Sequence, residues 1–494
     1  MENAAMGNPR SGRQRALVPV LVSLGMLVAV VSSLGAPLVP TIAAEEHVSL
    51  NDAQWSLTVT LLVGAVVTPV MGRLGDGPRR RPVILGALVA VLTGCVLAAL
   101  PLGMGSLVTG RALQGLGLGL IPLAIATARD ALPPERSRPA VALLSITTVA
   151  GVGLGYPVTG LIAQSYGLYA GFWFGAVVSA AALVAAVVVL PPSPRRAAPR
   201  LDVPGAVLLG TALAGLLLAL SEAELWGWGS ARLLALVVGC VLLLALWVVH
   251  ELRTARPLVD LRLTKDRSVL TANVTALVAG LGMYLLLSLV TRFVQTPREA
   301  GYGFGASVAV TGLVLLPFSL ASLAAGRVVP LLARRAPTAL VLSLGCAVSL
   351  AAVLAFALAR EQLWELFVIM AVAGFGIGWM FAVMPGMIVG SVPAHETGSA
   401  MSFNQVLRYV GYSTGSVLSA AILQAHTAAG SALPTGDGYR TAALLACGVW
   451  VAMIAVAAVL PPRRRRAAVA APAPDAAAVS RQPGGDAVRH EAAR

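Results

Sequence analysis

Charged residues are scarce in this chain of 494 residues. Only 11% of the residues are Asp, Glu, Lys or Arg, whereas about a quarter of the residues of a soluble domain are charged. Hydrophobic residues make up 57% of the chain, and they occur in uncharged runs of about 20 residues, the length that a membrane-spanning helix needs. This composition excludes a soluble enzyme with a polar shell. The short alternating segments that are typical of outer-membrane barrels are absent as well.

Cysteine and lysine are also rare. The four cysteines, Cys95, Cys240, Cys346 and Cys447, lie inside apolar runs, and no pair has the spacing of metal ligands. We therefore expect small buried side chains at these positions, with no metal site and no cofactor. Only one of the 35 basic residues is a lysine, Lys265, so the chain contains no nucleotide-binding P-loop ending in Gly-Lys-Ser or Gly-Lys-Thr.

The chain also lacks a metalloprotease motif and a recognisable nucleic-acid-binding pattern. No His-Glu-x-x-His sequence is present, and we predict that the protein is not an enzyme. The net charge of +14 comes from short arginine clusters between apolar runs and near the C-terminus, without interleaved aromatic residues. Such clusters do not indicate a nucleic-acid interface. The predicted partners are the lipid bilayer and a small-molecule substrate, and no nucleic acid.

Fourteen apolar segments are each long enough to cross a hydrocarbon core of roughly 30 Å. They lie at residues 16–39, 53–72, 82–101, 105–128, 139–163, 168–190, 204–222, 230–250, 268–292, 305–326, 336–359, 363–390, 398–426 and 439–460. We therefore predict an all-α polytopic membrane protein. Arginines on both sides of 204–250 favour fourteen spans over twelve, because they place both ends of that pair on one side of the membrane.

The basic residues predict the orientation in the membrane. Most of them lie before the first span, after the last span, or in every second loop, whereas the outer segment 40–52 has none. Since basic residues concentrate in cytoplasmic loops, we predict a multi-pass protein of the cell membrane with both termini in the cytoplasm.

Three glycine patterns recur along the chain at offsets of 254, 259 and 260 residues. The pairs are Gly72-Arg73 with Gly326-Arg327, Gly115-x-Gly117-x-Gly119 with Gly374-x-Gly376-x-Gly378, and Gly151-xxx-Gly155 with Gly411-xxx-Gly415. Nearly equal offsets predict two related six-helix halves with an extra helix pair inserted between them. The predicted divisions are a cytoplasmic N-terminus at 1–15, a first half at 16–190, an inserted two-helix segment with its flanking loops at 191–267, a second half at 268–460, and a disordered cytoplasmic tail at 461–494.

The loop after the second span combines glycine, arginine and aspartate. It reads Gly72-Arg73-Leu74-Gly75-Asp76-Gly77-Pro78-Arg79-Arg80-Arg81. This sequence resembles the signature loop of the major facilitator superfamily, in which charge pairs lock the cytoplasmic side and break when the transporter turns inward. The resemblance implies a gate that consists of Gly72, Arg73, Asp76, Arg80 and Arg81, with Gly326 and Arg327 as its second copy.

Within this loop we expect Asp76 at the start of the following helix, where negative charge is favoured. The second copy has no acidic counterpart, because Pro330 stands at that position. The alternative to a gate is a solvated loop that only sets the topology.

Arg111 and Gln114 lie three residues apart in the fourth span and therefore share one helix face. An arginine inside a span is costly and tends to face a partner or a water-filled cavity. The run that starts at Arg111 is similar to the superfamily's span-4 motif, whose arginine is linked to proton coupling. The alternative is that Arg111 extends to the outer interface, since it lies only about six residues into the span.

The fifth span contains a run of small residues between Gly151 and Gly160, with Gly155 and Pro157 among them. Small residues four apart let helices pack closely, and plain packing is one interpretation. The run also resembles the span-5 motif that is typical of efflux antiporters in this superfamily, although Tyr156 stands where glycine is usual. That resemblance implies export.

Arg408 lies about ten residues into the thirteenth span, too far from either interface to reach water easily. We predict that it faces a cavity together with Asn404 and Gln405. The alternative is an arginine that backbone carbonyl groups hold for structural reasons. Polar, aromatic and methionine side chains in the spans are candidates for the wall of a cavity that binds a bulky, partly apolar solute: Asn273, Tyr284, Tyr156, Trp379, Phe381 and Met384. Their spacing is also typical of plain helix packing.

The run from Glu396 through Arg408 to Gly411 and the order of six, two and six spans resemble the fourteen-helix drug/proton antiporter branch of the superfamily, over about residues 16–460. The resemblance implies a monomeric secondary transporter that exports a small amphipathic compound or drug by alternating access, driven by protons. No acidic residue lies in the middle of a span, so the proton is implied by the resemblance alone. The residues leave open a second hypothesis, in which a specific metabolite, in one version an anion, is transported without proton antiport.

Overall fold

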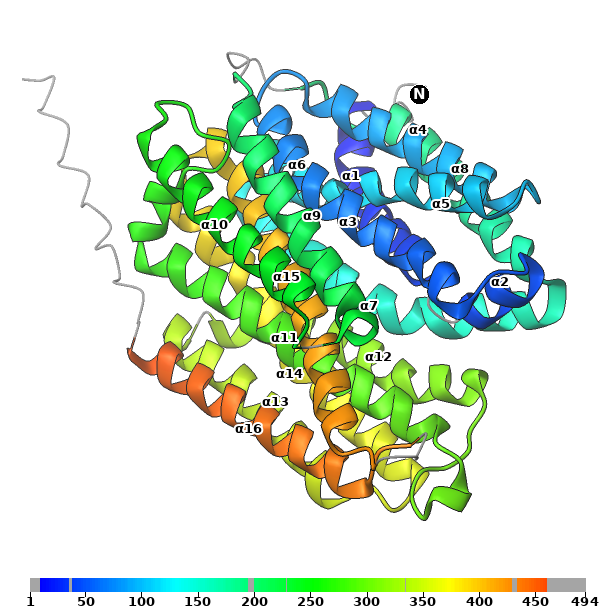
Figure 1. The fold of residues 1–494 in the computed structure, drawn as a ribbon. Coiled ribbons are helices and arrows are strands. Elements are labelled where there is room, and N and C mark those ends of the chain that lie inside the picture. Colours follow the sequence, from blue (N-terminus) through cyan, green and yellow to red (C-terminus); the bar gives the residue numbers. More distant parts are fainter. Residues whose placement is uncertain are drawn as a thin grey trace, which may run out of the picture. The chain divides into compact units, whose positions relative to one another are not determined.

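The computed structural model describes residues 9–34, 38–193, 200–227, 229–333, 335–428 and 433–459, and every regular element within them is a helix (Figure 1). Eleven helices in these ranges are long and apolar enough to cross a membrane. Large apolar side chains such as Val187 on α8 (Leu168–Val189) and Leu242 on α10 (Ala231–Arg253) are exposed, as expected for surfaces that face lipid. The predicted fold class, an all-α polytopic membrane protein, is confirmed.

Two groups of helices show the same internal arrangement. The first consists of α1 (Pro9–Ser33), α3 (Leu50–Gly75), α4 (Arg80–Ala99), α5 (Met104–Gly115), α6 (Leu120–Ala131), α7 (Pro134–Tyr166) and α8; the second consists of α11 (Arg267–Gln295), α12 (Val308–Ala333), α13 (Thr338–Leu358), α14 (Leu363–Ser391), α15 (Thr397–Ala425) and α16 (Gly436–Val459). In the first group α7 packs on α1 and α4 packs on α5 and α8. In the second group α15 packs on α11 and α13 packs on α14 and α16. We refer to these groups as the first half and the second half.

The contacts between the halves are reciprocal. Helix α7 of the first half packs against α12, and its counterpart α15 packs against α3, the counterpart of α12. Such an exchange of equivalent contacts is expected for two copies related by an approximate two-fold axis. The middle of α7 and of α15 therefore lies at the interface between the halves.

The recurring glycines lie at equivalent helix contacts. A side chain on Gly115 would meet the backbone of α3, and one on Gly374 would meet the backbone of α12. In the same way, a side chain on Gly151 would meet α1, and one on Gly411 would meet α11. Because glycine lets two backbones approach closely, the sequence repeat records helix contacts that occur in both halves.

Two predicted spans differ from the observed helices. The span predicted at 16–39 is too long, because α1 ends at Ser33 and a separate short helix, α2 (Val39–Glu45), begins with Pro40 in its first turn. The span predicted at 105–128 is interrupted, because a 3₁₀ turn at Leu116–Gly119 joins α5 to α6. Two of the four residues in that turn are glycines, which weaken a continuous α-helix.

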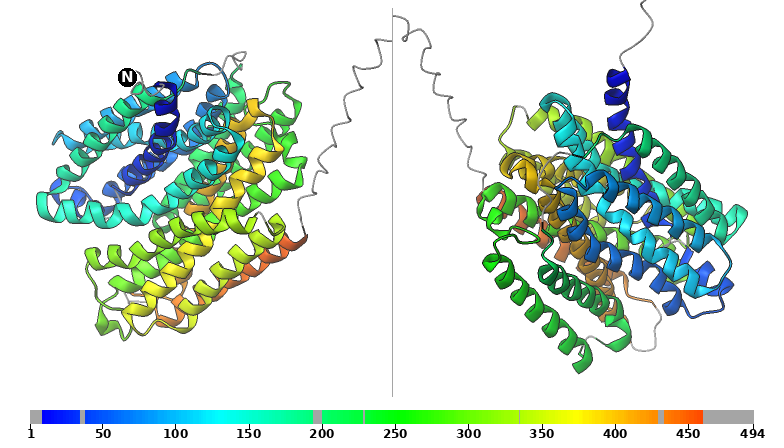
Figure 2. Two further views of the ribbon diagram at one scale, coloured as in Figure 1. Left: turned by 180° about the vertical axis from the view of Figure 1, so that it is seen from behind. Right: turned by 90° about the horizontal axis from the view of Figure 1, so that it is seen from above.

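The helix pair between the halves in sequence packs beside them in space. Helix α9 (Val203–Trp226) packs on α10 and also contacts α3 and α15. Leu209, Leu213 and Leu217 of α9 belong to one apolar cluster with Ala65 of α3 and Val406 of α15. Helix α10 leaves most of its apolar side chains exposed. The pair therefore lies against one helix of each half (Figure 2).

Candidate functional site

Asp76 lies at the end of α3, where the first half meets the start of α15. The residue is 3% exposed, and its Oδ1 and Oδ2 accept hydrogen bonds from the backbone N–H groups of Gly398 at 2.6 Å and Ser399 at 2.9 Å. The first N–H groups of a helix lack partners within the helix and favour a negative charge. The position expected for Asp76, at the start of its own following helix, is wrong, since α4 begins at Arg80. The carboxylate caps a helix of the other half instead.

The burial of Asp76 makes its contact with α15 sensitive to pH. Desolvation raises the pKa of this carboxyl from 3.8 to about 6, while the hydrogen bonds from Ser399 and Gly398 lower the pKa, and the charge of Glu396 raises it further. A carboxyl that leaves this contact and meets water regains its ordinary pKa. A carboxyl in this contact therefore binds a proton more tightly than a carboxyl in water, and a falling pH favours the contact below about pH 6.

An ion pair of Arg73 and hydrogen bonds of Arg129 join the halves beside Asp76. Arg73 Nη1 donates to both carboxylate oxygens of Glu396 at 2.9 Å, and the two side chains are 8% and 16% exposed. Arg129 of α6 donates from Nη2 to the carbonyl oxygen of Val392 at 3.0 Å and from Nη1 to the hydroxyl of Thr397. Together with the Asp76 contacts these residues form a layer of contacts between the halves, which we call the gate layer after the predicted gate: Arg73, Asp76, Arg129, Glu396, Thr397, Gly398 and Ser399.

Two other arginines of the loop bind within the first half. Arg80 donates from Nε to the carbonyl oxygen of Gly75 at 2.6 Å and from Nη1 to Asp130 Oδ2 at 2.7 Å. Arg81 donates from Nη2 to the carbonyl oxygen of Val187 at 2.7 Å. These contacts fix the turn after α3 against α6 and α8. In the described ranges neither arginine bonds to the second half, so neither takes part in the gate layer.

The second copy of the loop keeps the helix contact but not the charges. Gly326 packs on Ile146 of α7, just as Gly72 packs on Ser402 of α15. Arg327 is exposed, and it forms no ion pair in the part of the chain that the structure describes.

Arg408 lies at the interface between the halves, in the middle of α15. It is 1% exposed, and its Nη2 donates to the hydroxyl of Ser145 on α7 at 2.8 Å. The guanidinium carbon lies 4.2 Å from the ring centre of Phe381 on α14. Its Nε and Nη1 have no hydrogen-bond partner among the described residues. No backbone carbonyl accepts from Arg408 there, so the structural alternative does not describe this residue.

Arg111 is also buried, but the first half supplies acceptors for its Nε and Nη1. Its Nε donates to the carbonyl oxygen of Ser56 at 2.9 Å, and its Nη1 donates to that of Val31 at 2.9 Å and to Gln114 Oε1 at 2.6 Å. The alternative in which Arg111 reaches the outer interface is wrong, because the residue is 1% exposed. Arg111 ties α5 to α1 and α3, and nothing in these contacts reaches the second half.

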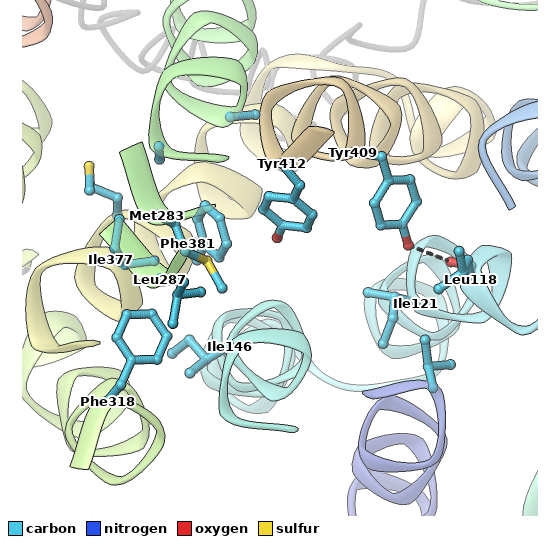
Figure 3. Close-up of a cluster of buried hydrophobic side chains, with 14 of the residues drawn as sticks. Leu118, Ile121, Ile146, Met283, Leu287, Phe318, Ile377, Phe381, Tyr409 and Tyr412 are labelled. Carbon is cyan, nitrogen blue, oxygen red and sulfur yellow. Dashed lines mark hydrogen bonds between the residues drawn. The ribbon is translucent and has the colours of Figure 1, made fainter. Parts of the chain in front are cut away.

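Aromatic side chains lie close to Arg408. Tyr284 of α11 stacks on Tyr412 of α15 with ring centres 4.6 Å apart, and Tyr412 lies edge-on to Tyr409 at 6.0 Å. The Tyr409 hydroxyl donates to the carbonyl oxygen of Leu118 at 3.4 Å. Figure 3 shows both α15 tyrosines pointing toward helices of the first half, with Phe381 nearby. The structure thus brings together Tyr284 and Phe381, two of the candidate cavity residues, with Arg408.

The remaining candidates have different surroundings. Asn404 Nδ2 donates to Asn273 Oδ1 at 3.1 Å and so ties α15 to α11, and Gln405 beside it is buried. Trp379 Nε1 donates to the carbonyl oxygen of Val341 at 2.7 Å, which directs this ring toward α13. Met384 is fully buried. The surroundings of three candidates on α7 lie outside the described residues: Tyr156, Pro157 and Gly160.

Comparison with known proteins identifies the family. The profile of the Major Facilitator Superfamily matches residues 21–359 and, a second time, residues 274–491. The chain belongs to the major facilitator superfamily. The first match extends from the first half through the inserted pair into the second half, and the second match begins in α11.

Several superfamily relatives have been found in bacteria. An uncharacterised MFS-type transporter of Mycobacterium tuberculosis is 30% identical over 81% of this chain, which spans only 58% of that relative's length. The tetracenomycin C resistance and export protein of Streptomyces glaucescens is 28% identical over 83% of this chain and 76% of its own length. Multidrug resistance protein 3 of Bacillus subtilis is 26% identical over 74% of this chain and 71% of its own length.

A solved superfamily structure has the same fold. The crystal structure of the human organic anion transporter MFSD10 (TETRAN) matches with a TM-score of 0.63 and 18% identity, over 90% of this chain and 99% of that one. At this identity the match concerns the arrangement of the helices alone.

Several residues of the gate layer and of the interior escaped the sequence analysis. Arg129 lies in an ordinary basic cluster at the end of a span, and Ser145 is a single hydroxyl in an apolar run. Neither has a local signal, because each matters only through a partner in the other half. Tyr412 had a usable signal, since it lies four residues after Arg408 and therefore on the same helix face.

One further cluster of titratable groups lies at the end of the inserted pair. Asp202 caps the start of α9, and His250 Nε2 lies 3.0 Å from Asp202 Oδ2. Glu251 is 1% exposed, and its Oε1 and Asp202 Oδ2 both point at Gly205. One turn away, Trp247 packs on Phe403 of α15 with ring centres 6.0 Å apart. The cluster therefore adjoins the helix that carries both Glu396 and Arg408.

The sequence Gly411-Tyr412-Ser413-Thr414-Gly415 has the letter pattern of a hydrolase nucleophile elbow. That motif requires a sharp strand-to-helix turn that exposes the serine. Here the five residues lie inside α15, which is helical from Thr397 to Ala425. The match is therefore a coincidence of a small-residue helix face.

Proposed function

We propose that this chain is a secondary transporter, rather than an enzyme, that exports a small amphipathic organic compound across the cell membrane by alternating access. The gate layer carries this proposal. It closes one end of the interface between two equivalent halves with hydrogen bonds and one ion pair, all of which can exchange with water. Contacts of this kind can form and break as the halves rock about a central site.

The gate layer lies at the cytoplasmic end in this proposal, with both termini on the same side. The distribution of arginines supports that orientation. Export is supported by the printed names of the relatives from Streptomyces glaucescens and Bacillus subtilis, which concern resistance and export. An amphipathic substrate is supported by the interior cluster, where tyrosine rings lie beside apolar side chains such as Ile121 and Ile146 (Figure 3).

Protons are the driving ion in this proposal, by resemblance to the drug/proton antiporter branch. The spans contain no central acidic residue, so the proton must bind elsewhere. Two groups are candidates, the carboxyl of Asp76 in the gate layer and the cluster of Asp202, His250 and Glu251 beside α15. Both lie near the gate end, where protonation can change the contacts of α15 with the rest of the protein.

Transport into inverted membrane vesicles tests the proposal. Vesicles that contain the protein should accumulate at least one compound of an amphipathic panel when a proton gradient is imposed, and Glu396→Gln should change the rate. Arg327→Gln is the matched control, because Arg327 stands at the equivalent position of the other half without an ion pair among the described residues. Absence of gradient-driven movement for every compound would end the proposal.

The second hypothesis, transport of an anionic metabolite without proton antiport, is favoured by the buried charge of Arg408. The same assay separates it from the first. Flux of an anion that persists after the proton gradient is collapsed would support the second hypothesis against proton-driven export.

A further inference from the structure

Arg408 carries a charge that its own chain does not balance. The three helices that carry Arg408 and its contacts, α7, α14 and α15, contain only two acidic residues, Glu135 and Glu365, and each lies in the first turn of its helix. The hydrogen-bond acceptor and the aromatic ring that contact Arg408 are both neutral, the Ser145 hydroxyl and the Phe381 ring. A buried guanidinium surrounded by neutral groups is costly inside a membrane protein.

The unused donors of Arg408 define what would complete the site. Nε and Nη1 are both N–H donors at every pH, and both lack a partner in the described part of the chain. A carboxylate or a sulfonate supplies at least two acceptor oxygens, and an ionised phenol supplies one oxygen with a negative charge. N–H donors of a guanidinium bind such charged acceptors more strongly than neutral ones. Buried donors without acceptors are disfavoured, so the geometry selects a ligand that brings an anionic group.

The rings beside Arg408 indicate the rest of the ligand. Tyr284 and Tyr412 stack on each other, and Tyr409 stands edge-on to that stack. Aromatic side chains bind planar rings through stacked and edge-to-face contacts. A planar aromatic body next to an anionic group therefore matches the two kinds of surface found here.

The location at the interface gives access to this site during transport. Ser145 belongs to the first half and Arg408 to the second, so rocking of the halves separates the one side-chain hydrogen bond that Arg408 makes in the described structure. The guanidinium of Arg408 then loses the Ser145 hydroxyl as its acceptor and can bind the anionic group of a ligand, which is a stronger acceptor.

We propose that Arg408 binds the anionic group of the transported compound, and that this compound is an aromatic organic anion. The proposal rests on the proposed transport function for its biological meaning, but the binding step can be measured without transport. Arg111, another fully buried arginine of the interior, serves as a contrast, because its Nε and Nη1 already have acceptors.

Two dyes of nearly equal shape test the charge preference. Fluorescein and rhodamine 123 share a three-ring planar core, but at neutral pH the first is an anion and the second a cation. Fluorescence anisotropy with purified protein in nanodiscs should show saturable binding of fluorescein, at least about tenfold tighter than that of rhodamine 123. Arg408→Gln should weaken fluorescein binding at least about tenfold, and Arg408→Lys should restore part of it, because it keeps the charge.

The control variant is Arg232→Gln. Arg232 is an exposed arginine of α10 that lies 3.9 Å from the ring centre of Trp226, and its loss should leave the binding of both dyes unchanged. A thermal unfolding curve for each variant establishes that it is folded.

The outcomes separate the two proposals. Fluorescein binding that Arg408→Gln abolishes supports the anion site, even where vesicles transport neither dye and the transport function fails. Equal binding of fluorescein by wild type and Arg408→Gln, or tighter binding of rhodamine 123, overturns the anion site. Absence of saturable fluorescein binding to the folded wild type overturns it as well.

Discussion

The two halves share their helix contacts but differ in their charged groups. Gly72 and Gly326 both let α3 or α12 pack closely on a helix of the other half. Only the first half adds Arg73 and Asp76, which bind the start of α15, whereas Arg327 is exposed. Backbone packing is therefore symmetric and the gate layer is not. The end of α3 supplies Arg73 and Asp76. The start of α15 supplies two N–H groups that donate to Asp76, and Glu396 beside it accepts from Arg73.

The buried arginines show the same contrast. Arg111 lies within the first half and donates to two backbone carbonyls and one side chain, so it stabilises the half that contains it. Arg408 lies at the interface, donates to one hydroxyl and keeps two donors unused. Arg111 and Arg408 are therefore equally buried but differ in the number of hydrogen-bond acceptors around the guanidinium.

The largest expected effect is on stability, and it tests the difference between Arg111 and Arg408. Arg111→Leu removes the donor from the carbonyl groups of Val31 and Ser56 and should lower the free energy of unfolding by about 2–3 kcal/mol. Arg408→Leu removes a charge that is poorly compensated and should cost less than Arg111→Leu, or stabilise the protein. Thermal unfolding of both variants in the same detergent measures the difference. A larger loss for Arg408→Leu would contradict the distinction.

A second variant breaks the gate layer itself. Asp76→Ala leaves the N–H groups of Gly398 and Ser399 without their acceptor, which should cost the closed state about 1–3 kcal/mol. The fraction of open molecules should rise accordingly, and labelling of a cysteine introduced beside the gate layer measures it. Asp76→Asn keeps one acceptor oxygen for the two N–H groups and removes a charge whose burial is unfavourable. Its fraction of open molecules should therefore lie below that of Asp76→Ala.

The pH dependence of the ratio of closed to open molecules tests the role of Asp76. The pKa of about 6 in the closed state exceeds that of a solvated carboxyl, so a proton stabilises the closed state more than the open one. Lowering the pH from 7 to 5 should therefore increase the ratio of closed to open molecules by about tenfold. The same labelling assay in the Asp76→Asn variant should show no such dependence. Opening of the wild-type gate on acidification would contradict the sign.

The smallest expected effect concerns the ion pair of Arg73. Glu396→Gln keeps an oxygen that can accept from Arg73, and it removes the repulsion between Glu396 and Asp76. It should therefore weaken closure by no more than about 1 kcal/mol. Arg327→Gln, at the equivalent place in the second copy, should have no measurable effect. Equal changes in gate labelling for both substitutions would show that the two loop copies act alike. The difference between Arg73 and Arg327 would then have no functional consequence.

The sequence predicted the parts of this fold that depend on local chemistry. The apolar runs predicted the helices, and the glycine offsets predicted the equivalent contacts at Gly115 and Gly374. The superfamily loop was recognised, and Arg73 and Asp76 do lie in the gate layer. Arg80 and Arg81 were grouped with them because they are close in sequence, but they bind α6 and α8. Adjacent residues on a turn point in different directions, which the sequence of the loop does not reveal.

The sequence by itself determined where helices form and that the chain contains two related halves, because the cost of a charge in lipid and the absence of a Cβ are properties of single residues. The tertiary structure decided which charges have partners. Asp76 caps a helix more than 300 residues away in the chain, Arg111 has its acceptors and Arg408 does not. Such differences depend on the rotation of each helix and on the groups that the other half places opposite it, and a one-dimensional pattern contains neither.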